Sequence, residues 1–136
     1  MALSDVMDIA ASGMTANRFW LERIANNLAN ANSTRSAEGG PYRREVPVFA
    51  EMLANELGAD SRGVEAVGIQ KDPSPFPLVY NPGHPDADAR GFLRMPNVNV
   101  VNEMVDMIAA SRTFEANITV SNAAKNMMNK AMEIGK

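Results

Sequence analysis

Cysteine is absent from the 136 residues of this chain, and aromatic residues make up only 6% of it. Without cysteine, the chain can form neither a disulfide framework nor a thiol-ligated zinc site. The formal net charge is −3, so the chain lacks the basic field that holds nucleic-acid phosphates. We therefore expect no nucleic-acid partner. With so few aromatic residues, we expect small and flexible apolar side chains to make contacts between helices, and not one large globular core.

Long apolar runs are absent as well. No stretch approaches the roughly 18 residues of a membrane-spanning helix, which predicts a chain that does not span a membrane. The first residues contain Asp5 and Asp8 and no basic residue before Arg18. A cleaved secretory signal needs a positive start and a continuous apolar stretch. Any export is therefore expected to proceed uncleaved and by another route.

Catalytic and metal-binding patterns are also lacking. No convergent catalytic set is present, so the chain is predicted not to be an enzyme and to carry no cofactor. The segment HPDAD, residues 84–88, suggests a metal site, and the run DADARG, residues 86–91, begins like a calcium loop. However, it continues with Arg90 at the fifth ligand position and Asn97 where a bidentate Glu belongs. One His and two Asp therefore indicate a plain turn and no metal site.

A helical repeat is present over residues 3 to about 32. Steps of four and three residues predict one long helix with a heptad seam. The residues in this repeat are Leu3, Met7, Ala10, Met14, Asn17, Leu21, Ile24, Leu28 and Ala31. Asn17 interrupts it, either as a solvent-facing residue or as a buried polar residue that sets the register.

A second helical repeat runs from about residue 98 to residue 132. Its members are Met104, Met107, Ser111, Phe114, Ile118, Ser121, Lys125, Met128 and Met132. We predict a mainly α fold in which helices within residues 1–32 and 97–136 pack as an antiparallel coiled-coil-like pair and form one domain.

The central region, residues 33–96, is expected to be a small β-hairpin or ribbon. Residues 42–49, 63–70 and 91–95 are strand candidates, and residues 51–57 are read as a helical turn. Five of the eight prolines lie between residues 72 and 85, a density that forbids helix and favours extended chain and turns.

Apolar residues cover a wide face of each predicted helix, and two helices packed together cannot bury all of that surface. The spare apolar surface must meet another chain, which is typical of an assembly protein. The predicted interface residues are Met14, Leu21, Ile24, Leu28, Ile108, Phe114, Ile118 and Met128. Asn26, Asn27 and Asn30 crowd the first helix end, where they either cap it or form hydrogen bonds between subunits.

Both termini carry motifs of a known family. IANNLANANST, residues 24–34, resembles the N-terminal signature of the flagellar rod and hook axial proteins, and residues 98–136 resemble their C-terminal module. Residues 78–101 and the short centre resemble the proximal rod members. The insertion TRSAEGG, residues 34–40, departs from most members, in which the Asn string runs straight into a Thr-Pro-Gly-aromatic turn.

The resemblance implies a structural subunit of the proximal rod of the bacterial flagellar basal body. Such a subunit would polymerise through its terminal helices with other copies and with neighbouring flagellar rod proteins, and form part of the drive shaft for motility. The resemblance also implies secretion by the flagellar type III export apparatus and a place in the rod across the periplasm. It favours a role of Asn26, Asn27 and Asn30 in subunit contacts. The alternative is a small soluble adaptor or secretion chaperone that acts through the same helices.

Overall fold

The fold is given by a computed structural model that describes residues 3–52 and 63–135. A long helix lies near each end of the sequence, α1 (Leu3–Ala29) and α2 (Val100–Ile134). Between them lie the strands β1 (Glu45–Met52), β2 (Gly63–Lys71), β3 (Leu78–Tyr80) and β4 (Phe92–Arg94). The predicted mainly α fold with a small β insert is therefore confirmed.

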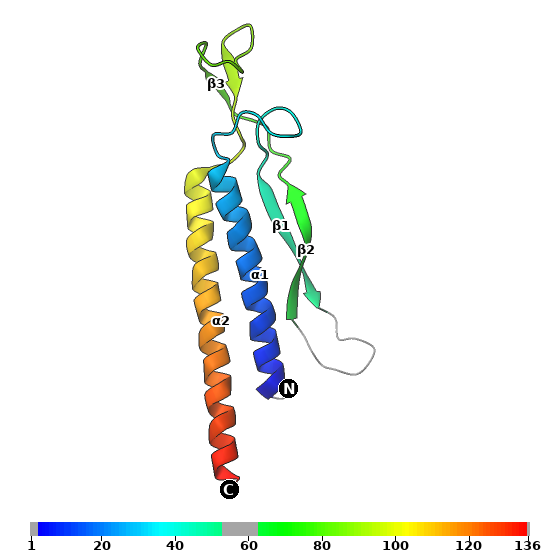
Figure 1. The fold of residues 1–136 in the computed structure, drawn as a ribbon, viewed down its shortest axis with the longest axis vertical. Helices are drawn as coiled ribbons and strands as arrows, with labels where there is room; N and C mark the ends of the chain where they lie inside the picture. The colour runs from blue at the N-terminus through cyan, green and yellow to red at the C-terminus, as the bar shows by residue number, and fades with distance from the viewer. Residues whose placement is uncertain (1–2, 53–62, 136) are drawn as a thin grey trace.

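The first helix lies between the other two long elements. α2 returns antiparallel to α1 on one side, and the β1–β2 hairpin packs along α1 on another (Figure 1). The short β3–β4 pair stands at the end of the molecule where α1 ends and α2 begins, and the C-terminal end of α2 extends past the start of α1. α1 thus has partners on two sides and α2 has a partner on one.

Small side chains make the contact between the helices. Part of the heptad seam predicted on α1 is buried, namely Ala10, Asn17 and Ile24, as is Ala31 in the turn after the helix. A Cβ atom on Gly13 would lie 2.9 Å from Asn117 Nδ2 of α2, so the helices approach closely where α1 has no side chain.

The row predicted on α2 was wrong in part. The buried residues are Glu103, Ala110 and Ala124, seven or fourteen residues apart, whereas Met104, Ile118, Lys125 and Met132 are exposed. Long side chains are excluded from a seam in which the helix backbones lie this close, so alanines occupy it.

One detail of α1 differs from expectation, and another decides between two alternatives. The helix ends at Ala29, three residues earlier than predicted, and a turn follows. Asn17 does not face solvent, because it is only 8% exposed and its Nδ2 donates to Gly13 O at 2.9 Å. A helix can bury Asn in this way because the amide satisfies its own donor within one turn.

Two separate two-stranded sheets replace the single ribbon that was expected. β1 pairs antiparallel with β2, with a register shift between Val48 and Phe49, and β3 pairs antiparallel with β4. A Cβ atom on Gly63 would lie 2.6 Å from Ser12 Oγ of α1, so glycine permits the close packing of β2 on the helix. Glu51 and Met52 belong to β1 and not to a helical turn; the remaining residues of that predicted turn lie outside the described residues.

Candidate assembly surface and the junction that positions it

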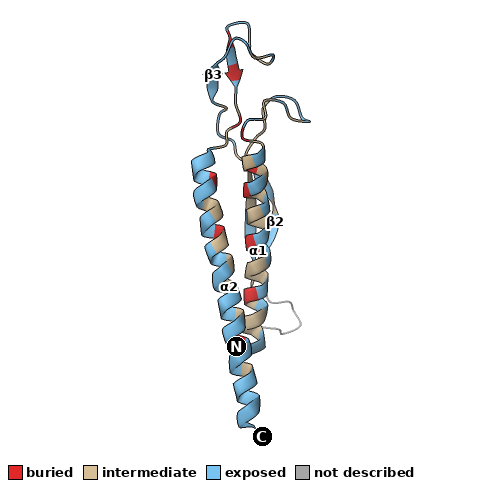
Figure 2. Cartoon of the chain, turned by 60° about the vertical axis from the view of Figure 1, so that its left-hand side comes forward, coloured by how far each residue is buried: buried red, intermediate tan, exposed pale blue. Residues whose placement is uncertain are grey.

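The first three turns of α2 present apolar side chains to solvent. Val101, Met104, Val105 and Ile108 are 68%, 54%, 60% and 62% exposed. Their spacing of i, i+3, i+4 and i+7 places them on one helix face, and we call this set the α2 patch. Figure 2 shows α2 as exposed over almost its whole length, whereas α1 is largely half-buried or buried. The α2 patch is therefore the leading candidate for an assembly surface.

A buried ion pair anchors the start of α2 beneath this patch. Glu103 is fully buried, and its carboxylate accepts a hydrogen bond from Arg44 Nε. Arg44 also reaches Asp106 through Nη2 at 3.3 Å and Asp72 through Nη1 at 3.6 Å. The other Glu103 oxygen accepts from Asn27 Nδ2 at 3.0 Å. A buried carboxylate is tolerated only when it is paired and hydrogen-bonded in this way.

Asn27 joins α1, α2 and β1 at one point. Its Nδ2 donates to Glu45 O at 2.9 Å and to Glu103, and its Oδ1 accepts from Glu45 N at 3.0 Å and from Tyr42 OH at 2.9 Å. The amide thus uses two donor and two acceptor positions. The Asn27 side chain pairs with both the N–H and the C=O of Glu45, as the backbone of a neighbouring strand would do at the start of β1. We call Asn27, Tyr42, Arg44, Glu45 and Glu103 the junction.

The titration behaviour of the junction follows from burial and charge. Burial raises the pKa of Tyr42 to about 12, with the nearby Glu45 carboxylate as the next cause. Burial acts to lower the pKa of Arg44, but the hydrogen bond and charge of Glu103 outweigh it, so the pKa lies above its ordinary value. The phenol therefore stays neutral and the guanidinium stays charged at physiological pH.

A side-chain cap fixes where α2 begins. Asn99 Oδ1 accepts from Val101 N at 3.0 Å and from Asn102 N at 3.1 Å, which satisfies two of the otherwise unpaired amides of the first turn. Two residues earlier, Asn97 Oδ1 accepts from Arg44 N at 2.8 Å. The cap and the junction together hold the α2 patch at a fixed place on the molecule.

The interface residues predicted in α1 are used mainly within the chain. Ile24 and Asn27 are each 1% exposed, so neither side chain is open to a neighbour. Met14, Leu21, Leu28, Asn26 and Asn30 are half-buried. Asn30 Nδ2 donates to Asn26 O at 2.9 Å and to Asn26 Oδ1 at 3.2 Å. Both amides therefore already have partners at the helix end.

The residues predicted in α2 divide into two groups. Ile108 and Ile118 are exposed, at 62% and 39%. Phe114 and Met128 are half-buried. Only Ile108 lies in the α2 patch, and the assignment of all four residues to a subunit interface stays a prediction.

Sequence analysis did not identify the junction. From its position in the first turn alone, Glu103 is an acid that favours the helix N-terminus, whereas the structure buries it. The available signal was its position, seven residues before Ala110, on what proves to be the buried row of α2. A charged residue on a buried row requires a partner of opposite charge, which here is Arg44.

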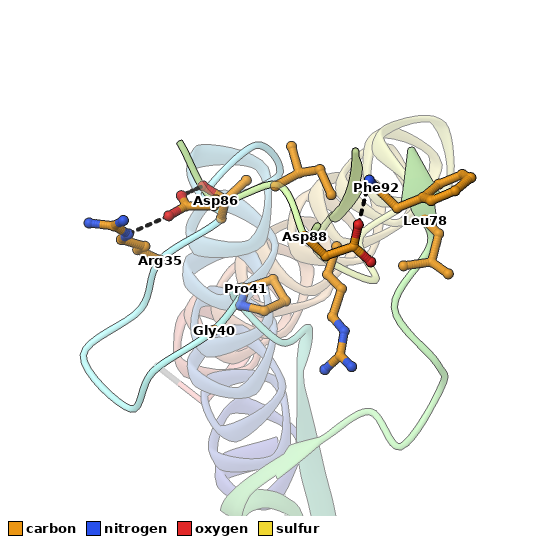
Figure 3. Close-up of a pocket in the computed structure, with 10 residues that line it drawn as sticks. Arg35, Gly40, Pro41, Leu78, Asp86, Asp88 and Phe92 are labelled. Carbon is orange, nitrogen blue, oxygen red and sulfur yellow. Dashed lines mark hydrogen bonds and ion pairs between the residues drawn. The ribbon is translucent and has the colours of Figure 1, made fainter. Parts of the chain in front are cut away.

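The HPDAD turn at the β3–β4 end is linked to the loop after α1. Asp86 accepts from Thr34 Oγ1 at 2.8 Å and pairs with Arg35 Nε at 2.6 Å (Figure 3). The hydrogen bond from Thr34 is the main reason that the pKa of Asp86 is lowered, and Arg35 adds to it. A hollow of about 550 Å³ lies between loop and turn. The turn therefore connects the β3–β4 end to the loop after α1, whereas the sequence predicted only a plain turn.

Within residues 3–52 and 63–135, no three His, Asp or Glu side chains are arranged to hold a metal ion. In the same part of the chain, neither helix is long and apolar enough to cross a membrane.

Comparison with known families matches both ends of the chain. The family model described as "Flagella basal body rod protein" matches residues 7–35, which cover most of α1 and the turn after it. The model described as "Flagellar basal body rod FlgEFG protein C-terminal" matches residues 89–134, which include β4 and α2.

Individual relatives match over the full length. The chain is 41% identical to flagellar basal-body rod protein FlgC of Borreliella burgdorferi, with 98% of each chain covered. It is 43% identical to FlgC of Yersinia enterocolitica, with both chains covered completely, and 39% identical to FlgC of Bacillus subtilis, with 96% of each covered. The resemblance to proximal rod proteins is thus confirmed, and the chain belongs to the FlgC family of flagellar basal-body rod proteins.

Proposed function

We propose that this chain is a structural subunit of the flagellar rod that polymerises with other copies of itself and with neighbouring rod proteins. Membership of the FlgC family supports the rod. The observation that carries the mechanism is the α2 patch, four large apolar side chains on one helix face that the chain itself leaves uncovered. Burial of apolar surface drives most protein association, and a patch of this kind marks an interaction site.

The junction supports a mechanical role. It connects both helices to β1 through a buried ion pair and a fully used amide. Buried polar networks of this kind rigidify and specify one arrangement. A rigid subunit transmits torque along a shaft, and this task needs neither a cofactor nor a catalytic group.

Three finer parts of the proposal rest on the family resemblance. The rod segment containing this chain lies in the proximal rod, within the periplasm. The chain reaches it through the flagellar type III export apparatus without losing a signal peptide. In the assembled rod the two helices act as one domain and form a coiled-coil-like pair, for which the heptad rows on α1 and α2 provide the spacing.

Fractionation tests the proposed function. A strain that lacks the gene and expresses an epitope-tagged copy should regain motility, and the tagged chain should co-purify with basal bodies after detergent extraction and sedimentation. The rival function, a soluble adaptor or secretion chaperone, requires the chain to stay in the cytosolic fraction. Restored motility with a purely cytosolic pool would contradict the rod assignment.

A further inference from the structure

A groove runs along α1 between the β1–β2 hairpin and α2. It has a volume of about 550 Å³ and is walled by all three elements. Its floor is α1 from Ile9 to Trp20, its hairpin wall includes Phe49 and Val64, and its α2 wall includes Thr113 and Asn117. The floor extends over eleven residue steps, which is about 16 Å at the helical rise. This length corresponds to three turns of helix.

The floor of this α1 groove suits the close approach of another helix. Ser12, Gly13 and Ala16 are small residues that line the floor, where Gly63 packs on Ser12 and Asn117 lies against Gly13. Small residues keep the floor low between its two walls, and an amphipathic helix in such a groove uses anchors at i, i+3, i+4 and i+7. The α2 patch has this spacing, and the helix face that it shares with Arg112 covers eleven residue steps from Val101.

Charge complementarity points to a second copy of this chain. Glu51 lies on the rim of the α1 groove, is exposed, and has no ion pair among the described residues. Arg112 follows Ile108 by one turn on the same face as the α2 patch. Its side chain is 79% exposed and, among the described residues, pairs only with Glu115, whose side chain is itself 64% exposed. A surface pair of this kind is worth little, so Arg112 can exchange Glu115 for a carboxylate on another copy.

We infer that the α1 groove binds the α2 patch of a second copy of this chain, with Glu51 of one copy paired to Arg112 of the other. This inference rests on the proposed function and specifies how it is performed. Gly63 packs on Ser12 and pairs with Met52, which places Glu51 near the Ile9 end of the groove. The bound α2 then runs antiparallel to α1, and therefore parallel to the α2 of the receiving copy.

The orientation has a consequence for assembly. The α1 groove and the α2 patch are different surfaces of one chain, so the contact is heterologous. A heterologous contact repeats in one direction and produces a ring or an open helical filament. All copies keep the same polarity, as a shaft with two different ends requires.

Cross-linking tests the contact directly, because the natural chain has no cysteine. We expect that purified full-length Glu51→Cys and Arg112→Cys chains form a disulfide-linked dimer when mixed and oxidised, and that neither forms a dimer alone. The matched control is Arg18→Cys, an exposed residue of α1 outside the groove, which should not cross-link with Arg112→Cys. No dimer in the mixture, or equal dimer from one variant alone, would overturn the inference.

Charge reversal gives a second readout in cells. Glu51→Arg and Arg112→Glu should each reduce the soft-agar swimming diameter by about twofold or more, and the double variant should recover most of it, because opposite charges again face each other. Failure of the double variant to recover would contradict the pairing. Capture of a different rod protein by Glu51→Cys in isolated basal bodies would overturn the choice of a second copy. Either result leaves the rod assignment intact, because co-purification of the natural chain with basal bodies tests that assignment separately.

Discussion

The two helices of this chain have similar lengths and very different surroundings. α1 has 27 residues and buries five of them, whereas α2 has 35 and buries three. The difference arises because, among the described elements, α1 packs against both α2 and the β1–β2 hairpin, and α2 packs only against α1. Apolar side chains on α1 therefore hold the subunit together, and the uncovered ones on α2 are available to other chains.

The comparison also explains how α2 is kept in place with so few buried residues. Two of the three are alanines, and the third is Glu103. Alanine contributes little apolar area, so the junction positions the first turns of α2 by hydrogen bonds and charge. Helices within proteins gain most of their stability from tertiary packing, and the C-terminal end of α2, which extends past the start of α1, has the least of it. The assembled rod is expected to supply the missing partner.

The largest contrast is expected between two isoleucines. Ile24→Ala should lower the free energy of unfolding by about 2–5 kcal/mol, because it removes a side chain that is 1% exposed and leaves a cavity. Ile108→Ala should stay within about 0.5 kcal/mol of the natural chain, because that side chain is 62% exposed. Urea denaturation of the purified monomers measures both values. Equal losses would show that the helices do not differ in the way described.

Two asparagines provide the next contrast. Asn27→Ala removes four hydrogen bonds and leaves Glu103 with one partner fewer in a buried site. We expect a loss of about 2–4 kcal/mol, since each unsatisfied buried group costs about 1–3 kcal/mol. Asn30→Ala should cost about 1 kcal/mol or less, because its bonds close only the local turn. A larger drop in the thermal unfolding midpoint for Asn30→Ala than for Asn27→Ala would contradict the role given to the junction.

Alkaline pH should weaken the junction by a smaller amount. The pKa of Tyr42 is raised to about 12, so between its ordinary value near 10 and 12 the unfolded chain loses the proton and the folded chain keeps it. The stabilising contribution is therefore complete below about pH 10 and lost as pH rises toward 12. Tyr42→Phe should flatten this part of the stability profile. An unchanged alkaline profile in that variant would show that Tyr42 is not the titrating group.

The smallest effect on stability is expected at the β3–β4 end. Asp86→Ala removes the links to Thr34 and Arg35, which lie far from the contact between the helices. Amide exchange should become faster in residues 78–94 and remain unchanged in α1. The matched variant His84→Ala should change neither region by a comparable amount, since the contacts of its ring with Asp86, the amide hydrogen bond to Nδ1 and a 3.8 Å approach to Oδ2, lie within the turn itself. Faster exchange throughout α1 would contradict the separation of the two regions.

Periodicity was sufficient to predict both helices, their order and the small β insert. The heptad seam predicted on α1 includes Ile24, which the structure buries within the chain, although Ile24 was predicted to lie at a subunit interface. Periodicity favoured large apolar residues on α2, because a single sequence does not reveal how closely two helices approach. That distance is set by Gly13 opposite Asn117, and it selects Ala110 and Ala124 over Met104 and Ile118.

The junction was beyond prediction for a different reason. Asn27, Arg44 and Glu103 lie far apart in the sequence and meet only after both helices and the hairpin are in place. Each residue alone has an ordinary reading, as a helix end, a strand charge or a first-turn acid. The α2 patch was easier to anticipate, since excess apolar residues on one helix indicate an uncovered face whatever the details of packing.

Ile108→Asp provides the most direct test of the central claim, that α2 serves assembly while α1 maintains the subunit. In a strain lacking the gene, this variant should be synthesised and secreted at the natural level, and the purified monomer should have the same circular dichroism and unfolding midpoint. A carboxylate buried without a partner in a subunit contact is unfavourable by several kcal/mol, so basal bodies should lack complete rods and cells should not swim. Normal swimming with normal rods would contradict the claim.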